Sequence, residues 1–253
     1  MKKIYTLAWT TFQELVRARF FVVGIVFAIL LVALSYLLST LSFDEENRIV
    51  FNLGLMGVEF VTIGLGLFAG ATLVSREIEL RTCQIILTRP LSRFHFLIGK
   101  WCGLFIFIAV ILIGLALVIL LLGGKPILKP AFFIIITQIG LKSLVIMSAV
   151  FLSSLFFRPV LAALLGITLY IAGHSIDDIQ FFIKRGISGE IPTIVKMMEV
   201  VIPRFDVFNW KSYYFLEKGI SSEQTFLMTA HFSSWIVFLV VISLIFWRKK
   251  DIG

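Results

Sequence analysis

One group of metal-ligating residue types stands close together in this sequence, namely His174, Asp177 and Asp178. Their spacing of three and four residues places them on one face of a helix. Imidazole and carboxylate groups in this arrangement are able to bind a divalent cation. No second cluster of ligands accompanies them, so the solvated end of a helix is favoured over a metal site.

Two ionisable residues, Glu59 and Lys142, lie deep inside long apolar runs. A charged side chain at the centre of a membrane helix costs about 2.5–3.5 kcal/mol on insertion scales, so each is expected to face protein or water. They are candidates to line a conduit or to pair with each other across two helices. The alternatives are that Lys142 extends toward the membrane surface, or that Glu59 lies near the outer boundary.

The groups that a membrane-embedded enzyme needs are not gathered at one depth. The three histidines, His95, His174 and His231, are scattered and form no His-x-x-x-His pair. The only Gly-Lys step near a glycine-rich turn, residues 123–125, lacks the earlier glycine and the following Ser or Thr of a phosphate-binding loop. We therefore expect no catalytic residue, no cofactor and no nucleotide site in this chain.

The composition identifies the environment in which these residues lie. Of 253 residues, 59% are hydrophobic and 15% are charged, and the mean hydropathy is +1.02. A soluble globular domain has about 45–50% apolar and about 25% charged residues. The net charge of +8 comes from basic residues beside the apolar runs, where they set topology and contact anionic lipid, so no nucleic-acid partner is expected.

The apolar runs predict an all-α polytopic membrane protein, a single domain over residues 1–253, because about 20 apolar residues cross the hydrocarbon core as a helix. Six transmembrane helices are predicted, at about 20–41, 49–74, 101–122, 131–157, 160–176 and 226–247. Residues 1–19 predict an amphipathic interfacial helix, which either anchors the first span or moves with it as an elbow. Residues 75–100 form a cytoplasmic region, and residues 177–225 an amphipathic extracytoplasmic segment that forms a gate or docks a partner.

The distribution of Lys and Arg predicts the orientation of the spans. Six spans place both termini on one side, and the segments on that side are rich in basic residues. The short loops on the other side hold only Arg48, Lys125 and Lys129. Basic residues concentrate in cytoplasmic loops, so both termini are predicted to be cytoplasmic and the chain to lie in the cytoplasmic (inner) membrane.

The segment after the second predicted span carries charged residues followed by an apolar patch. Ser75 is placed to cap a helix whose first turn holds Glu77 and Glu79, near the positive end of the helix dipole. Pro90 would end this helix. An ordinary interfacial loop is the alternative to a docking element for a cytoplasmic partner.

Four stretches of sequence carry a resemblance to a known family. They are Ser-Arg-Glu-Ile-Glu-Leu-Arg-Thr (75–82), Ile-Leu-Thr-Arg-Pro-Leu-Ser-Arg (86–93), Leu-Ile-Gly-Lys (97–100) and Ile-Pro-Arg-Phe-Asp-Val-Phe-Asn (202–209). Together with the six-span layout, they resemble ABC-2 type transporter permeases over nearly the whole chain. Within that family the sequence looks most like the nitrous-oxide-reductase maturation permeases. It departs at Leu91, where Val is usual, and at Arg204, where Asn is common.

The resemblance implies a permease subunit that pairs with a second copy of itself or a homologous permease. It also implies two separate ABC ATPase subunits, which hold ATP and Mg²⁺. The cytoplasmic helix would then be a coupling helix, with polar contacts from Arg76, Glu77, Glu79 and Arg81. The expected function is export, or mechanical signalling to an extracytoplasmic accessory protein. The alternatives are a self-contained ion-coupled carrier, for which we find no matching inverted repeats, and a membrane-embedded enzyme.

Overall fold

The computed structural model describes residues 2–18, 20–39, 46–79, 92–123, 129–184, 202–205, 210 and 221–249. Among these residues the regular structure is helical, and no strand forms. The helices are α1 (Lys2–Arg17), α2 (Phe20–Ser39), α3 (Glu46–Glu79), α5 (Arg93–Gly123), α6 (Pro130–Ser153), α7 (Pro159–Lys184) and α9 (Ser222–Lys249). The predicted all-α class is confirmed for the described part of the chain.

Several helices are long and apolar enough to cross a membrane, as the composition predicted. Among the residues that the structure describes, five qualify alone, with spans at Phe51–Ser75, Arg93–Leu122, Pro130–Ser153, Pro159–Ile176 and Ser222–Lys249. A sixth is reached only when α1 and α2 are taken together as one span that bends by 58°. The chain is therefore a helical multi-pass membrane protein, and the predicted count of six depends on that bent pair.

The helices do not begin and end where the apolar runs do. α5 starts at Arg93, eight residues before the predicted span, and α7 continues to Lys184 instead of ending at residue 176. α6 ends at Ser153, before the predicted limit of residue 157, and a turn leads to Pro159. An apolar run marks the part of a helix that suits lipid, whereas the helix itself continues while its backbone hydrogen bonds are satisfied.

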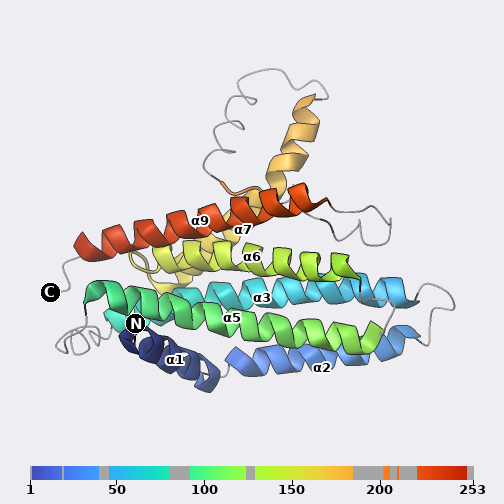
Figure 1. Cartoon of the computed structure of the whole chain (residues 1–253), viewed down its shortest axis with the longest axis horizontal. Helices are drawn as coiled ribbons and strands as arrows, with labels where there is room; N and C mark the ends of the chain where they lie inside the picture. Colours follow the sequence, from blue (N-terminus) through green and yellow to red (C-terminus); the bar gives the residue numbers. More distant parts are fainter. Residues whose placement is uncertain are drawn as a thin grey trace.

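The helices form a bundle in which the start of α1 and the end of α9 lie at the same end (Figure 1). The start of α5 contacts the end of α9. Arg93 Nη1 donates to the carbonyl of Arg248 at 3.2 Å, and Phe96 stacks on Trp247. α3 and α6 pack against each other, and α7 crosses them obliquely (Figure 1). This crossing brings residues of α3, α6 and α7 to one place inside the bundle.

The interfacial helix α1 docks directly on the start of α5. A Cβ atom added at Gly99 would lie 2.7 Å from Leu7, and one at Gly103 would lie 2.5 Å from Thr11. Two glycines four residues apart let the helix backbones approach this closely. Lys100, between them, donates to Glu14 at 3.1 Å. α1 is therefore held by protein contacts as well as by any contact with lipid.

Candidate functional site

The two buried charges predicted from the sequence meet in the bundle. Lys142 Nζ on α6 donates to Glu59 Oε1 on α3 at 2.8 Å, and both side chains are buried. The prediction that these residues pair across two helices is confirmed. Extension of Lys142 toward the membrane surface is wrong, because that residue is fully buried.

Small polar residues beside the pair let α3 and α6 approach. Ser143 Oγ, next to Lys142, donates to Thr62 Oγ1 at 3.0 Å. Gly66, one turn further along α3, lies against Met147 of α6. Small side chains and hydrogen bonds of this kind are what hold membrane helices together in the absence of a hydrophobic driving force between them. The ion pair therefore lies in a closely packed seam between two helices.

A histidine from α7 completes the cluster, which we call the Glu–Lys–His cluster (Glu59, Lys142 and His174). His174 Nε2 lies 3.2 Å from Lys142 Nζ and 3.9 Å from Glu59 Oε1. Its Nδ1 lies 3.1 Å from the carbonyl oxygen of Tyr170. A carbonyl oxygen only accepts, so Nδ1 carries the hydrogen and Nε2 of the neutral ring accepts from the Lys142 ammonium. The cluster then carries one positive and one negative charge, which compensate each other.

Part of the predicted extracytoplasmic segment covers this cluster. The Phe205 N–H donates to the Gly173 carbonyl at 3.1 Å. The Phe205 ring centroid lies 5.6 Å from the His174 ring and 5.9 Å from Lys142 Nζ, within the range of a cation–π contact. A Cβ atom at Gly173 would lie 2.4 Å from the Phe205 ring. Glycine at position 173 therefore allows this segment to close over the cluster.

A further polar residue extends the same region of α6. Gln138 lies one helical turn before Lys142 and is fully buried. Within the described residues, neither its side-chain nitrogen nor its side-chain oxygen has a hydrogen-bond partner. Buried polar groups usually have hydrogen-bond partners, and in the described part of the chain the Gln138 amide is an exception. It adds a buried polar group one turn away from the Glu59–Lys142 ion pair. Sequence analysis missed Gln138 and Phe205, although Gln138 is a polar residue inside an apolar run.

The predicted metal group is only partly described. His174 is engaged with Lys142 and Tyr170, whereas the side chains of Asp177 and Asp178 lie outside the described residues. Their backbone belongs to α7, so this helix continues beyond the candidate span, which ends at Ile176, into the first residues of the segment 177–225. No three His, Cys, Asp or Glu residues are grouped to hold a metal ion in the described ranges. Metal binding at this helix end stays a prediction.

The predicted coupling helix does not begin at Ser75. α3 runs through this position to Glu79, and Ser75 Oγ donates to the carbonyls of Ser154 and Phe157, at 3.0 and 3.2 Å. Ser75 therefore joins α3 to the end of α6 and caps no separate helix. The last turn of α3 contains three of the predicted coupling residues, Arg76, Glu77 and Glu79, whose side chains lie outside the described part of the structure. The fourth, Arg81, lies outside it entirely.

Comparison with known proteins adds no further assignment. The chain matches no protein-family model, and no curated protein is significantly similar to it. The fold and the site define a class all the same, which is a helical multi-pass membrane protein with a Glu–Lys–His cluster enclosed by three of its helices.

Proposed function

We propose that this chain is the permease subunit of an ATP-driven transporter of the ABC-2 type. It works as a dimer in the cytoplasmic (inner) membrane, with cytoplasmic termini and two separate ATPase subunits that bind ATP and Mg²⁺. The observation that supports this function is the continuity of α3. One helix carries both the charged residues of the family-like motif, Arg76, Glu77 and Glu79, and the buried Glu59.

Such a helix is suited to transmit force. Glu79 lies 20 residues after Glu59 on α3, which is about 30 Å along the helix at 1.5 Å per residue. Ser75 attaches the same helix to the end of α6, next to the turn that leads into α7. A displacement applied at the charged end by an ATPase would therefore reach all three helices of the Glu–Lys–His cluster. Closure of the ATPase would drive export, or a mechanical signal to an extracytoplasmic partner.

The test is affinity purification of the detergent-solubilised chain, followed by an ATPase assay of the eluate. Wild type is compared with Glu79→Arg and with Glu46→Arg, which makes the same charge reversal at the opposite end of α3. We expect ATPase activity with wild type and Glu46→Arg, and a decrease of about tenfold or more with Glu79→Arg, because reversing an interfacial charge juxtaposes like charges. Wild type that purifies without ATPase activity would refute the proposal.

The Glu–Lys–His cluster favours a second candidate function, a self-contained ion-coupled carrier, because ionisable groups inside membrane bundles frequently form proton relays. The two candidates differ in proteoliposomes that contain this chain alone and a pH-sensitive dye. A carrier dissipates an imposed pH gradient, and a Glu59→Gln/Lys142→Met variant does not. A permease that needs ATPase subunits leaves the gradient intact in both cases.

A further inference from the structure

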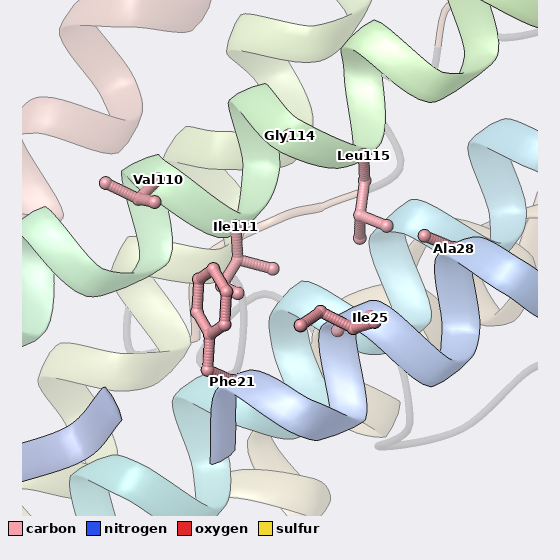
Figure 2. A pocket seen from close by; sticks show the side chains of 8 residues that line it. Phe21, Ile25, Ala28, Val110, Ile111, Gly114 and Leu115 are labelled. Carbon is pink, nitrogen blue, oxygen red and sulfur yellow. The ribbon is translucent and has the colours of Figure 1, made fainter. Parts of the chain in front are cut away.

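A groove lies between α2 and α5, away from the Glu–Lys–His cluster. It has a volume of about 170 Å³, and its walls include Phe21, Gly24 and Ile25 of α2 and Ile111, Gly114 and Leu115 of α5. Figure 2 shows side chains of the two helices facing each other across it. Every residue of the wall is apolar or glycine. The groove therefore offers no hydrogen-bonding group from a side chain to a polar ligand.

Glycine keeps this groove open. A Cβ atom added at Gly114 would have no neighbouring atom within 4 Å, so this glycine leaves space where other glycines of the bundle permit close packing. The volume is below the about 300–1,000 Å³ of pockets that enclose small molecules. A segment of a hydrocarbon chain suits both its size and its apolar walls.

A cationic residue precedes the α2 wall of the groove in the sequence. Arg17 is the exposed last residue of α1, four residues before Phe21. The outer face of α1 also exposes Tyr5 and Trp9, at 71% and 47%. Exposed aromatic residues of this type mark the headgroup level of a bilayer. Arg17 then lies at the level of lipid phosphates, which a guanidinium binds through paired hydrogen bonds.

We propose that this groove binds one anionic phospholipid, with an acyl chain between α2 and α5 and the phosphate at Arg17. Residues 21–28 rise about 10 Å along α2, a large part of the about 15 Å depth of one leaflet. A second copy of the chain fits less well, since a stable protein interface buries at least about 1,000 Å² and this groove would accept little more than one side chain. The site lies outside the proposed ATPase-coupling region and is independent of it.

Native mass spectrometry of the delipidated full chain tests this site, with phosphatidylglycerol and phosphatidylcholine added separately at equal concentration. Wild type should retain one phosphatidylglycerol and much less phosphatidylcholine. Gly114→Leu fills the groove and should lower the bound fraction by about tenfold. Gly64→Leu is the matched control, because Gly64 on α3 also has open space around its Cβ position.

The headgroup contact has its own pair of variants. Arg17→Gln should reduce phosphatidylglycerol binding to the level of phosphatidylcholine, whereas Arg158→Gln, at an exposed arginine between α6 and α7, should leave it unchanged. Equal binding of the two lipids by wild type would overturn the proposal. The same holds if Gly114→Leu and Gly64→Leu retain equal lipid, or if Gly114→Leu changes only the oligomeric state, which would assign the groove to a second copy.

A second measurement does not depend on any variant being folded. Phosphatidylglycerol with a diazirine in its acyl chain is photo-crosslinked to the wild-type chain in nanodiscs, and the labelled peptides are sequenced. Labels concentrated in 21–28 and 110–115 would support the site. Labels spread equally over the lipid-facing residues of α7 and α9 would contradict it.

Discussion

Two Lys–Glu pairs join helices in the described part of this protein, and their surroundings differ. Lys100 and Glu14 lie 3.1 Å apart where α1 meets α5, with side chains 5% and 54% exposed, so water reaches the carboxylate but not the ammonium. Lys142 and Glu59 lie 2.8 Å apart inside the bundle, with side chains 1% and 5% exposed. A pair whose carboxylate is open to water is partly screened and contributes about 1 kcal/mol or less, whereas removing one partner of a pair buried on both sides costs about 3–5 kcal/mol. A Lys–Glu ion pair is therefore expected to contribute little to stability where α1 meets α5, whereas inside the bundle loss of one partner is expected to be strongly destabilising.

The largest effect is expected at the buried pair. Lys142→Met leaves the Glu59 carboxylate without its ammonium partner and should lower the free energy of unfolding by about 3–5 kcal/mol. Lys142→Met combined with Glu59→Gln removes both charges and should recover most of this loss. Thermal unfolding in detergent measures both variants. If the single variant were as stable as the double one, the buried pair would not be a strict requirement.

The next largest effect is expected at the α1–α5 contact, where close packing should contribute more to stability than the Lys100–Glu14 ion pair. Gly103→Val places a side chain within 2.5–2.8 Å of Thr11 and the Ala8 carbonyl, and should destabilise the contact by about 1–3 kcal/mol. Gly114→Val is the control, since its site is open. Faster proteolysis of α1 in Gly103→Val alone is the expected result. Equal proteolysis of both variants would contradict it.

The role of His174 in the cluster predicts a smaller difference between two substitutions. His174→Leu removes the acceptor for Lys142 and should cost about 1–2 kcal/mol, the usual consequence of an unsatisfied buried donor. His174→Gln retains an acceptor oxygen and should cost less. Unfolding midpoints of the two variants in one detergent give the comparison. A leucine variant at least as stable as the glutamine variant would show that the hydrogen bond does not matter.

The smallest effect is expected at the Lys100–Glu14 pair, where only the carboxylate is exposed. Glu14→Gln removes the charge that faces Lys100 but keeps an acceptor oxygen for its ammonium at a position that water reaches, so stability should change by about 1 kcal/mol or less. The difference from wild type should disappear in about 1 M salt, where screening reaches about 3 Å. Unfolding midpoints at low and high salt test this directly. A change as large as that of Lys142→Met would remove the distinction between the two pairs.

The sequence predicted the helices better than their contacts. Apolar runs predicted the candidate spans, because they reflect the energy of lipid contact along a single helix. The pairing of Glu59 with Lys142 was one of several alternatives, since their distance depends on how α3 and α6 pack. The contribution of His174 to this pair was missed, because its spacing to the aspartates was visible and its position on an oblique helix was not.

Ser75 shows why a local pattern misled. Serine followed by two acidic residues is typical of a helix start, yet α3 continues through it. The hydroxyl instead donates to carbonyls at the end of α6, 79 and 82 residues away in sequence. Phe205 is similar, since its motif was recognised but its contact with Gly173 depends on tertiary structure. Local propensity gives way where a distant partner satisfies the same polar group.

We propose that ATP hydrolysis by a partner subunit acts through α3 on the Glu–Lys–His cluster and the segment that covers it. The most direct measurement is the rate of thiol labelling at Arg204→Cys, beside Phe205, in a chain whose two natural cysteines are replaced by serine. The co-purified complex is labelled with and without ATP and vanadate, and again after two glycines are inserted behind Ser75 to interrupt α3. We predict that ATP and vanadate change the labelling rate in the uninterrupted chain and leave it unchanged after the insertion. The same labelling rate in all four conditions would contradict the proposed coupling through α3.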